Sequence, residues 1–226
     1  MGDAIGQMLA SAVGIAISPL PLIAVILMLA TPRGRANGLA FTAGWVVALA
    51  VVVGAVTAAA GGADAAGHAH GTGGWAAWLK LALGLVFLLL AAQQWRGRPR
   101  DGQQPSTPGW MAAIDRFTPV RSAGLAAALA ALNPKNLVLA VGGALAIASS
   151  GASGGGTAVA AAVMVVIGSL CALLPLGVYL CGGSRAARVL DGWKSWLGAH
   201  NAAIMITVLA VLGAKYLGDA ITALTG

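Results

Sequence analysis

The chain has 226 residues and a net charge of +7, yet 59% of its residues are hydrophobic and only 8% are charged, against about 25% charged in an ordinary soluble domain. So few charges cannot cover the surface of a soluble globule of this length, which excludes an ordinary cytosolic enzyme, a nucleic-acid-binding protein and a disordered tail. We therefore expect an all-α integral membrane protein built from small-residue helices.

A membrane-spanning helix needs about 20 apolar residues in a row. The N-terminus lacks the basic region of a cleavable signal peptide, so the first apolar segment is expected to remain in the mature protein. Two segments have polar interruptions near their middles, at Ser18-Pro19-Leu20-Pro21 and at Asn133-Pro134-Lys135-Asn136. A third carries Pro175 late in its sequence. The six expected spans are residues 4–30, 38–60, 75–93, 122–148, 157–180 and 202–224.

Basic and non-basic loops alternate along the chain. The loops after the first, third and fifth spans carry Lys and Arg, whereas residues 61–74 and 149–156 carry neither. The positive-inside rule then predicts a plasma-membrane protein with the three basic loops in the cytoplasm and both termini outside. Within the longest loop, four apolar residues recur at helical spacing and predict a short helix at the membrane surface. They are Trp110, Met111, Ile114 and Phe117.

The chain divides into two halves of three spans, residues 1–95 and 122–226, joined by a cytoplasmic linker at 96–121. An offset of 115 residues places Ser18-Pro19 on Asn133-Pro134. Because three spans is an odd number, the second half must insert upside down relative to the first. Inverted repeats with discontinuous helices are typical of transporters. The alternative is that these prolines merely kink membrane helices, as prolines often do.

Both proline motifs are candidate substrate sites. Proline lacks an N–H group and clashes with the carbonyl four residues earlier, so each motif is expected to free backbone groups in mid-membrane. The Ser and Asn side chains beside the prolines can satisfy those groups or contact a polar substrate. The candidate substrate-binding residues of the two motifs are Ser18, Pro19, Pro21, Asn133, Pro134, Lys135 and Asn136.

Lys135 is the most informative single residue because it lies inside an apolar run. A lysine at the membrane centre costs about 2.5–3.5 kcal/mol on insertion scales, so such residues usually serve function. If buried, it offers a fixed cation or a proton-binding amine to an anionic group. The alternative is a lysine that extends to the outer interface.

A second candidate pair lies in the sixth span. Lys215 and Asp219 are four residues apart, so they share a helix face and can form an ion pair. The sequence leaves open whether they bind substrate or form a surface pair near the outer end. Lys80 follows two tryptophans and is expected to be an interfacial anchor.

The sequence lacks the residue patterns that metal binding, phosphate binding and nucleophilic catalysis require. No carboxylate falls in the middle of any span, and His68 and His70 make a weak ligand set, so we expect no metal and no cofactor. The chain also lacks a phosphate-binding loop and a Ser/His/Asp constellation, and is not expected to be an enzyme. Cys171 and Cys181 share one span and are expected to be free thiols.

Four segments carry a resemblance to a known family: AVGIAISPLPLIAVILMLATPRGRANGLAF, WMAAIDRF, ALNPKNLVLAV and GAKYLGDAI. They resemble the lysine-exporter superfamily and, within it, the GAP family of actinobacteria, also called Sap or sulfolipid-1-addressing proteins. The resemblance implies a multi-pass membrane protein linked to moving lipids or glycolipids to the cell envelope. The superfamily also holds thiol–disulfide carriers, which need cysteines at the broken spans, where this chain has Ser18 and Asn133.

Three functions remain open from the sequence. The first is a transporter or flippase for an anionic lipid or glycolipid. The second is a non-transporting membrane partner that helps to assemble an envelope lipid export complex beside a larger pump. The third is a small-solute exporter of the amino-acid type. Stretches of small residues permit close helix packing, either within one chain or in a homo-oligomer.

Overall fold

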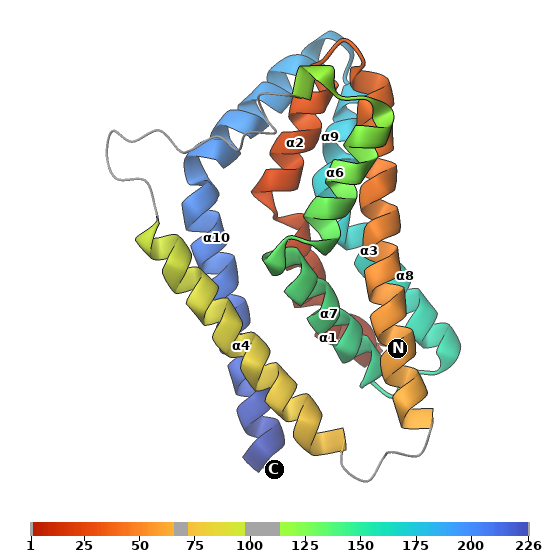
Figure 1. The fold of residues 1–226 in the computed structure, drawn as a ribbon, viewed down its shortest axis with the longest axis vertical. Coiled ribbons are helices and arrows are strands. Elements are labelled where there is room, and N and C mark those ends of the chain that lie inside the picture. Colours follow the sequence, from red (N-terminus) through yellow and green to blue (C-terminus); the bar gives the residue numbers. More distant parts are fainter. Residues whose placement is uncertain (1, 66–71, 98–113, 226) are drawn as a thin grey trace.

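The computed structural model describes residues 2–65, 72–97 and 114–225, and this part of the chain is helical and contains no strand (Figure 1). Its long helices and short 3₁₀ turns (η) follow one another without intervening domains. They are α1 (Gly2–Ala16), α2 (Pro19–Leu29), α3 (Gly34–Ala65), α4 (Thr72–Arg96), η1 (Ile114–Arg116), α6 (Pro119–Ala131), α7 (Pro134–Ala148), α8 (Gly154–Gly168), α9 (Leu170–Cys181), η2 (Gly183–Arg185) and α10 (Ala186–Thr225).

Three of these helices, α3, α4 and α10, are each long and apolar enough to cross a membrane. The pairs α1–α2, α6–α7 and α8–α9 also pass this test and are bent by 48°, 64° and 58°. Counting each bent pair as one span gives up to six spans within the described residues. The breaks predicted in the first and fourth spans are confirmed, each where a helix begins with proline.

The bend in the fifth span was not predicted from the sequence. It lies at Gly168 and Ser169, whereas Pro175 lies inside α9. Gly/Ser pairs are a recognised cause of sharp kinks. The N–H of Ala172 donates to Ser169 O rather than to Gly168 O, so the Gly168 carbonyl leaves the helix ladder. It accepts instead from Trp45 Nε1 at 3.3 Å, which ties the bend to α3.

The sixth span also differs from its expected bounds, because α10 begins at Ala186 and has 40 residues. A helix of that length is about 60 Å long, roughly twice the hydrocarbon thickness of a bilayer. Its first part carries an exposed ion pair between Lys194 and Asp191, 2.6 Å apart. Figure 1 shows this part running obliquely from α9 before the rest of the helix lies along α4. The expected span, residues 202–224, lies in the later part of α10 and is by itself about 34 Å long, enough to cross a bilayer.

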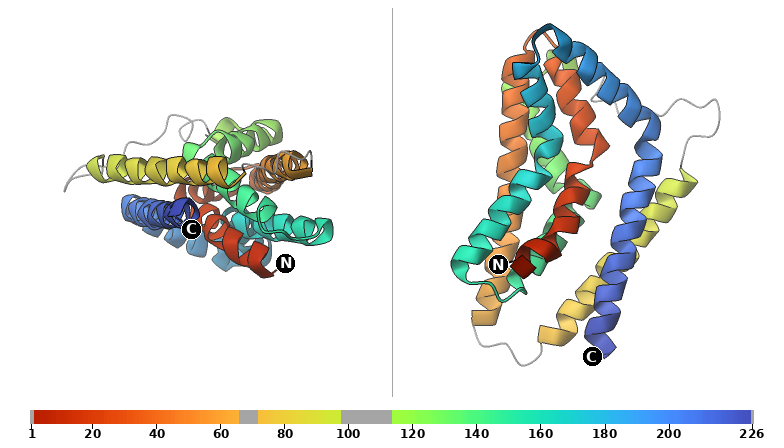
Figure 2. Two further views of the ribbon diagram at one scale, coloured as in Figure 1. Left: turned by 90° about the horizontal axis from the view of Figure 1, so that it is seen from below. Right: turned by 180° about the vertical axis from the view of Figure 1, so that it is seen from behind.

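Three described connections that carry basic residues lie at one end of the molecule, here called the basic end and defined by residues 30–33, 114–118 and 182–185. Figures 1 and 2 show these connections together, while α1 begins and α10 ends toward the other end, here called the opposite end. The expected surface helix falls mostly outside the described residues. Its described part is the short turn η1, whose Ile114 is buried in the core.

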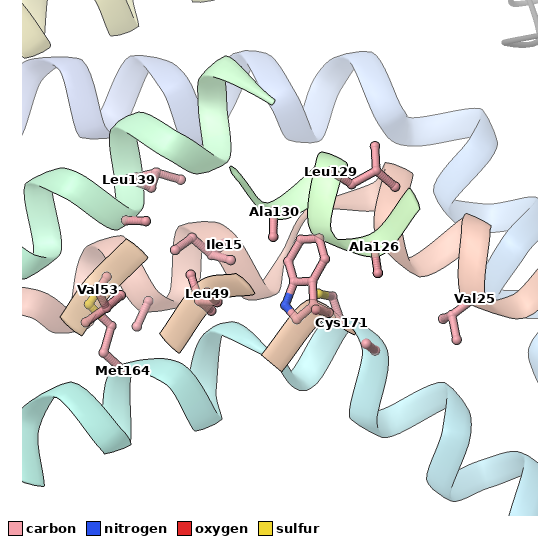
Figure 3. Close-up of a cluster of buried hydrophobic side chains, with 14 of the residues drawn as sticks. Ile15, Val25, Leu49, Val53, Ala126, Leu129, Ala130, Leu139, Met164 and Cys171 are labelled. Carbon is pink, nitrogen blue, oxygen red and sulfur yellow. The ribbon is translucent and has the colours of Figure 1, made fainter. Parts of the chain in front are cut away.

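Helices from the two halves of the chain interlock. α3 packs mainly against α6 and α7, α1 against α7 and α8, α2 against α9, and α4 against α10. Figure 3 shows apolar side chains from both halves of the chain meeting in one core, among them Ile15, Leu49, Ala126 and Leu139. This interlocking brings the two proline breaks together.

A test of this packing is available at Gly44 of α3, which lies against the backbone of Ala123 on α6. A Cβ at Gly44 would lie 2.6 Å from the Ala123 carbonyl oxygen, so the two backbones must separate. We expect Gly44→Ala to lower the free energy of unfolding by about 1–3 kcal/mol through overpacking. Gly54 on the same helix has nothing within 4 Å of its Cβ position, so Gly54→Ala should leave the melting temperature unchanged or raise it. Equal melting temperatures in detergent for the two variants would contradict this packing.

Candidate functional site at the two broken helices

The two proline breaks meet in the middle of the molecule through side-chain hydrogen bonds. The Lys135 ammonium donates to Ser18 Oγ at 2.9 Å, and Ser18 Oγ donates to Asn136 Oδ1 at 2.8 Å. Ser18 is more than a hundred positions from Lys135 and Asn136 in the sequence, and all three residues are at least 95% buried. We call Ser18, Lys135 and Asn136 the break site.

Each break positions its side chains for a local reason. Pro19 and Pro134 occupy the first turns of α2 and α7, where a missing N–H costs nothing. Asn133 caps α7, because its side-chain oxygen accepts from the Lys135 backbone N–H at 3.1 Å. Asn136 Nδ2 donates to the Leu129 carbonyl at 3.0 Å. The amide of Asn136 therefore joins the end of α6 to the first turn of α7 and to α2.

The Lys135 ammonium has more hydrogen-bonding capacity than the protein uses. An ammonium carries three donors, and among the described residues only Ser18 Oγ accepts from it. The two ion pairs in the described part of the chain are elsewhere, at Lys194–Asp191 and Lys215–Asp219. A buried cation with no carboxylate partner is costly unless another group pairs with it. The break site thus presents a net positive charge with free donors.

The helix geometry adds to this positive charge. α2 and α7 both begin at the break site, so the N-terminal ends of two half-helices lie beside the Lys135 ammonium. Helix N-termini carry a partial positive charge and favour anions. Discontinuous helices in transporters bind anionic groups in this way. The arrangement suits an anionic group and disfavours a metal cation.

Sequence reasoning missed one neighbour of this site. Cys171 on α9 is buried and lies close enough to Lys135 for an electrostatic interaction between the two side chains. Figure 3 shows it among the side chains of the buried apolar cluster. The unforeseen bend at Ser169 places it there, and its thiol donates to the Gly168 carbonyl at 3.5 Å. The Gly168-Ser169 pair was the one sequence signal for that bend.

Lys215 and Asp219 do form the expected ion pair, at 2.6 Å, but away from the break site. They line an open pocket of about 560 Å³ with Lys80 and Tyr216, near the opposite end of the molecule. No residue of the break site lines this pocket. The substrate-binding candidates thus form two groups, one central and one toward the opposite end.

Two other expectations concern metals. His68 and His70 lie outside the described residues. Among the residues that the structure describes, no three His, Cys, Asp or Glu side chains form a metal-binding group.

A family model matches residues 8–222, nearly the whole chain, and is described as Sap, sulfolipid-1-addressing protein. The chain belongs to the Sap family. This confirms the family indicated by the four sequence segments, and the match includes all residues of the break site. No curated protein and no solved structure matches the chain. The apolar helices and the family match together identify a membrane protein of the Sap family. The family is named for the addressing of a sulfolipid.

Proposed function

We propose that this Sap-family protein translocates an anionic lipid or glycolipid across the plasma membrane toward the cell envelope. One observation carries the proposal: a buried lysine without a carboxylate partner lies where two half-helices begin. A sulfate or phosphate headgroup would neutralise this charge and accept its free hydrogen bonds. Charge-assisted hydrogen bonds to such groups are among the strongest in proteins.

The family description agrees with this chemistry, because a sulfolipid carries the kind of anion that the break site suits. Charge interactions are screened little in a site away from water. A lipid must also pass its headgroup through the apolar part of the membrane, where an unpaired charge is costly. A fixed cation midway would lower that barrier for an anionic headgroup but not for a neutral one.

The packing supports an inverted repeat in the proposed transporter. In the first half, α3 packs on α6 and α7 of the second half; correspondingly, α8 and α9 pack on α1 and α2. The two broken spans also meet at their breaks, where Ser18, next to Pro19, bonds Lys135 and Asn136 in the first turn of α7. We include membership of the lysine-exporter superfamily in the proposal, because the resemblance of the chain to that superfamily implies such a repeat.

We propose that the basic end faces the cytoplasm, following the alternation of loop charge. Reporter fusions after Gly62 and after Gln103 test this orientation. Phosphatase activity is expected for the first fusion and not for the second, whereas a cytoplasmic reporter should show the reverse. Phosphatase activity after Gln103 together with cytoplasmic-reporter activity after Gly62 would contradict both the orientation and the inverted repeat.

Reconstitution in liposomes distinguishes lipid translocation from the two alternative functions, an assembly partner and a small-solute exporter. The protein would be purified, reconstituted in liposomes without any other protein, and given a fluorescent phosphatidylglycerol or a fluorescent sulfatide. Loss of fluorescence from inner-leaflet label on adding an impermeant quencher reports flipping. Flipping above the rate of empty liposomes supports the proposal. Absence of flipping favours an assembly partner of a larger pump. If the same liposomes take up a labelled amino acid but do not flip lipid, the protein is a small-solute exporter.

A further inference from the structure

The pocket near the opposite end has charged side chains that the break site does not use. It lies where α4 and α10 approach α1 and α7, and its volume of about 560 Å³ is within the usual range for ligand sites. Lys80 of α4 and Lys215 and Asp219 of α10 contribute two positive charges and one negative charge to its wall.

The two lysines differ in how their charge is balanced. Lys215 pairs with Asp219 at 2.6 Å and lies 5.4 Å from the centre of the Tyr216 ring. Lys80 is half-buried and has neither a hydrogen bond nor an ion pair among the described residues. One positive charge in the pocket is therefore left over, which a singly charged anion would balance.

This pocket lies in line with the break site along α7. Gly142 lines the pocket and is seven residues after Lys135, so both lie on one face of α7, about 10 Å apart along its axis. Leu139, which lies between them in the sequence, is fully buried. A Cβ at Gly14 of α1 would lie 3.1 Å from the side chains of both Leu139 and Leu212. An apolar layer thus separates two cationic sites.

The pocket is also held in shape by its neighbours. Tyr216, part of its wall, shares a hydrogen bond with Ser11 of α1, 3.0 Å between the hydroxyl oxygens. Its hydroxyl packs against Gly142, where any Cβ would overlap with it. Three of the four helices that line the pocket, α1, α7 and α10, are therefore held together at Tyr216.

We infer that this pocket binds the phosphate or sulfate headgroup of an anionic lipid, as a second anion site beyond the break site. Lys80 and Lys215 would bind the headgroup, while Asp219 competes with it for Lys215. The pocket is open, and its wall includes apolar residues that suit the lipid portion, such as Leu83 and Leu145. The inference rests on the proposed function in one respect, that the bound lipid is the transported substrate. The experiment measures binding alone, without transport.

The test measures lipid binding to the purified full chain in detergent by native mass spectrometry. All variants carry Lys135→Met, so that the break site does not contribute. The probes are dilauroyl phosphatidylglycerol and sulfatide, and the control is dilauroyl phosphatidylcholine, which is zwitterionic and has no net charge. Adding Lys80→Met and Lys215→Met is expected to weaken binding of the two anionic lipids about tenfold, equivalent to about 1.4 kcal/mol. Binding of phosphatidylcholine should not change.

Two matched variants separate this inference from a structural effect. Lys194→Met removes a lysine of similar exposure, 35% against 36% for Lys215, that is also paired with an aspartate on α10; it should bind like the parent. Asp219→Asn removes the competing carboxylate and is expected to strengthen anionic-lipid binding several-fold, which damage to the fold would not do.

Three results would overturn the inference. They are undiminished anionic-lipid binding in the double lysine variant, weaker binding in Asp219→Asn, and displacement of the lipids by equimolar inorganic sulfate or phosphate. The last result would assign the pocket to a free anion. Loss of transport with intact pocket binding would instead contradict the proposed function alone.

Discussion

Lys135→Met is expected to lower substrate export from cells at least tenfold, while the amount of protein in the membrane stays at or above the wild-type level. Methionine keeps the approximate length of the side chain and removes the charge that would bind the headgroup. It also removes an insertion cost of about 2.5–3.5 kcal/mol. Loss of activity without loss of protein is therefore the expected signature of a functional lysine. Export and membrane level would be measured in the same cultures.

Two controls accompany this variant. Lys135→Arg should keep part of the export, because the charge survives while its shape and hydrogen-bonding pattern change. Lys194→Met, which removes an exposed lysine outside both sites, should export normally. Full export by Lys135→Met would show that the lysine does not bind substrate. Lys215 and Asp219 would then be the next residues to test.

Ser18→Asp is expected to abolish export by a different route, because it supplies the missing counter-ion. The serine hydroxyl lies 2.9 Å from the Lys135 ammonium, so a carboxylate at this position would pair with the lysine. The site would then lose its net positive charge and its attraction for an anionic headgroup. Asp and Ser are similarly favoured before a helix, so α2 should still begin at Pro19. Export is measured as above.

Ser18→Asn is the matched control for charge. It has the size of the aspartate variant, is equally suited to precede α2, and leaves Lys135 without a counter-ion. It should retain much more export than Ser18→Asp. Similar losses in both variants would indicate that side-chain size at Ser18 matters and would contradict the role assigned to the unpaired charge.

The sequence predicted those parts of the fold that follow from composition and proline chemistry. The helix breaks at Pro19 and Pro134 were predictable because proline cannot continue the hydrogen-bond ladder of a preceding helix. Lys135 was a candidate because a charge is costly in an apolar segment. Its alternative interpretation, a lysine reaching the outer interface, is wrong, since only 4% of the residue is exposed.

Other features depend on contacts between distant segments and had no strong sequence signal. The bend at Ser169 forms where Trp45 of α3 can bond the freed Gly168 carbonyl, and sequence spacing does not reveal that partner. The bend in turn brings Cys171 within range of an electrostatic interaction with Lys135. The pocket that joins Lys80 to Lys215 likewise requires α4 and α10 to lie side by side.

The central claim, selection of an anionic lipid by the Lys135 charge, is tested most directly by a ratio of flipping rates. Fluorescent phosphatidylglycerol and fluorescent phosphatidylcholine with identical acyl chains would be followed in liposomes containing either wild-type protein or Lys135→Met. The wild type is expected to flip the anionic lipid at least tenfold faster than the zwitterionic one, and the variant should lose that preference. Equal rates for both lipids in the wild type, or an unchanged preference in Lys135→Met, would contradict the account.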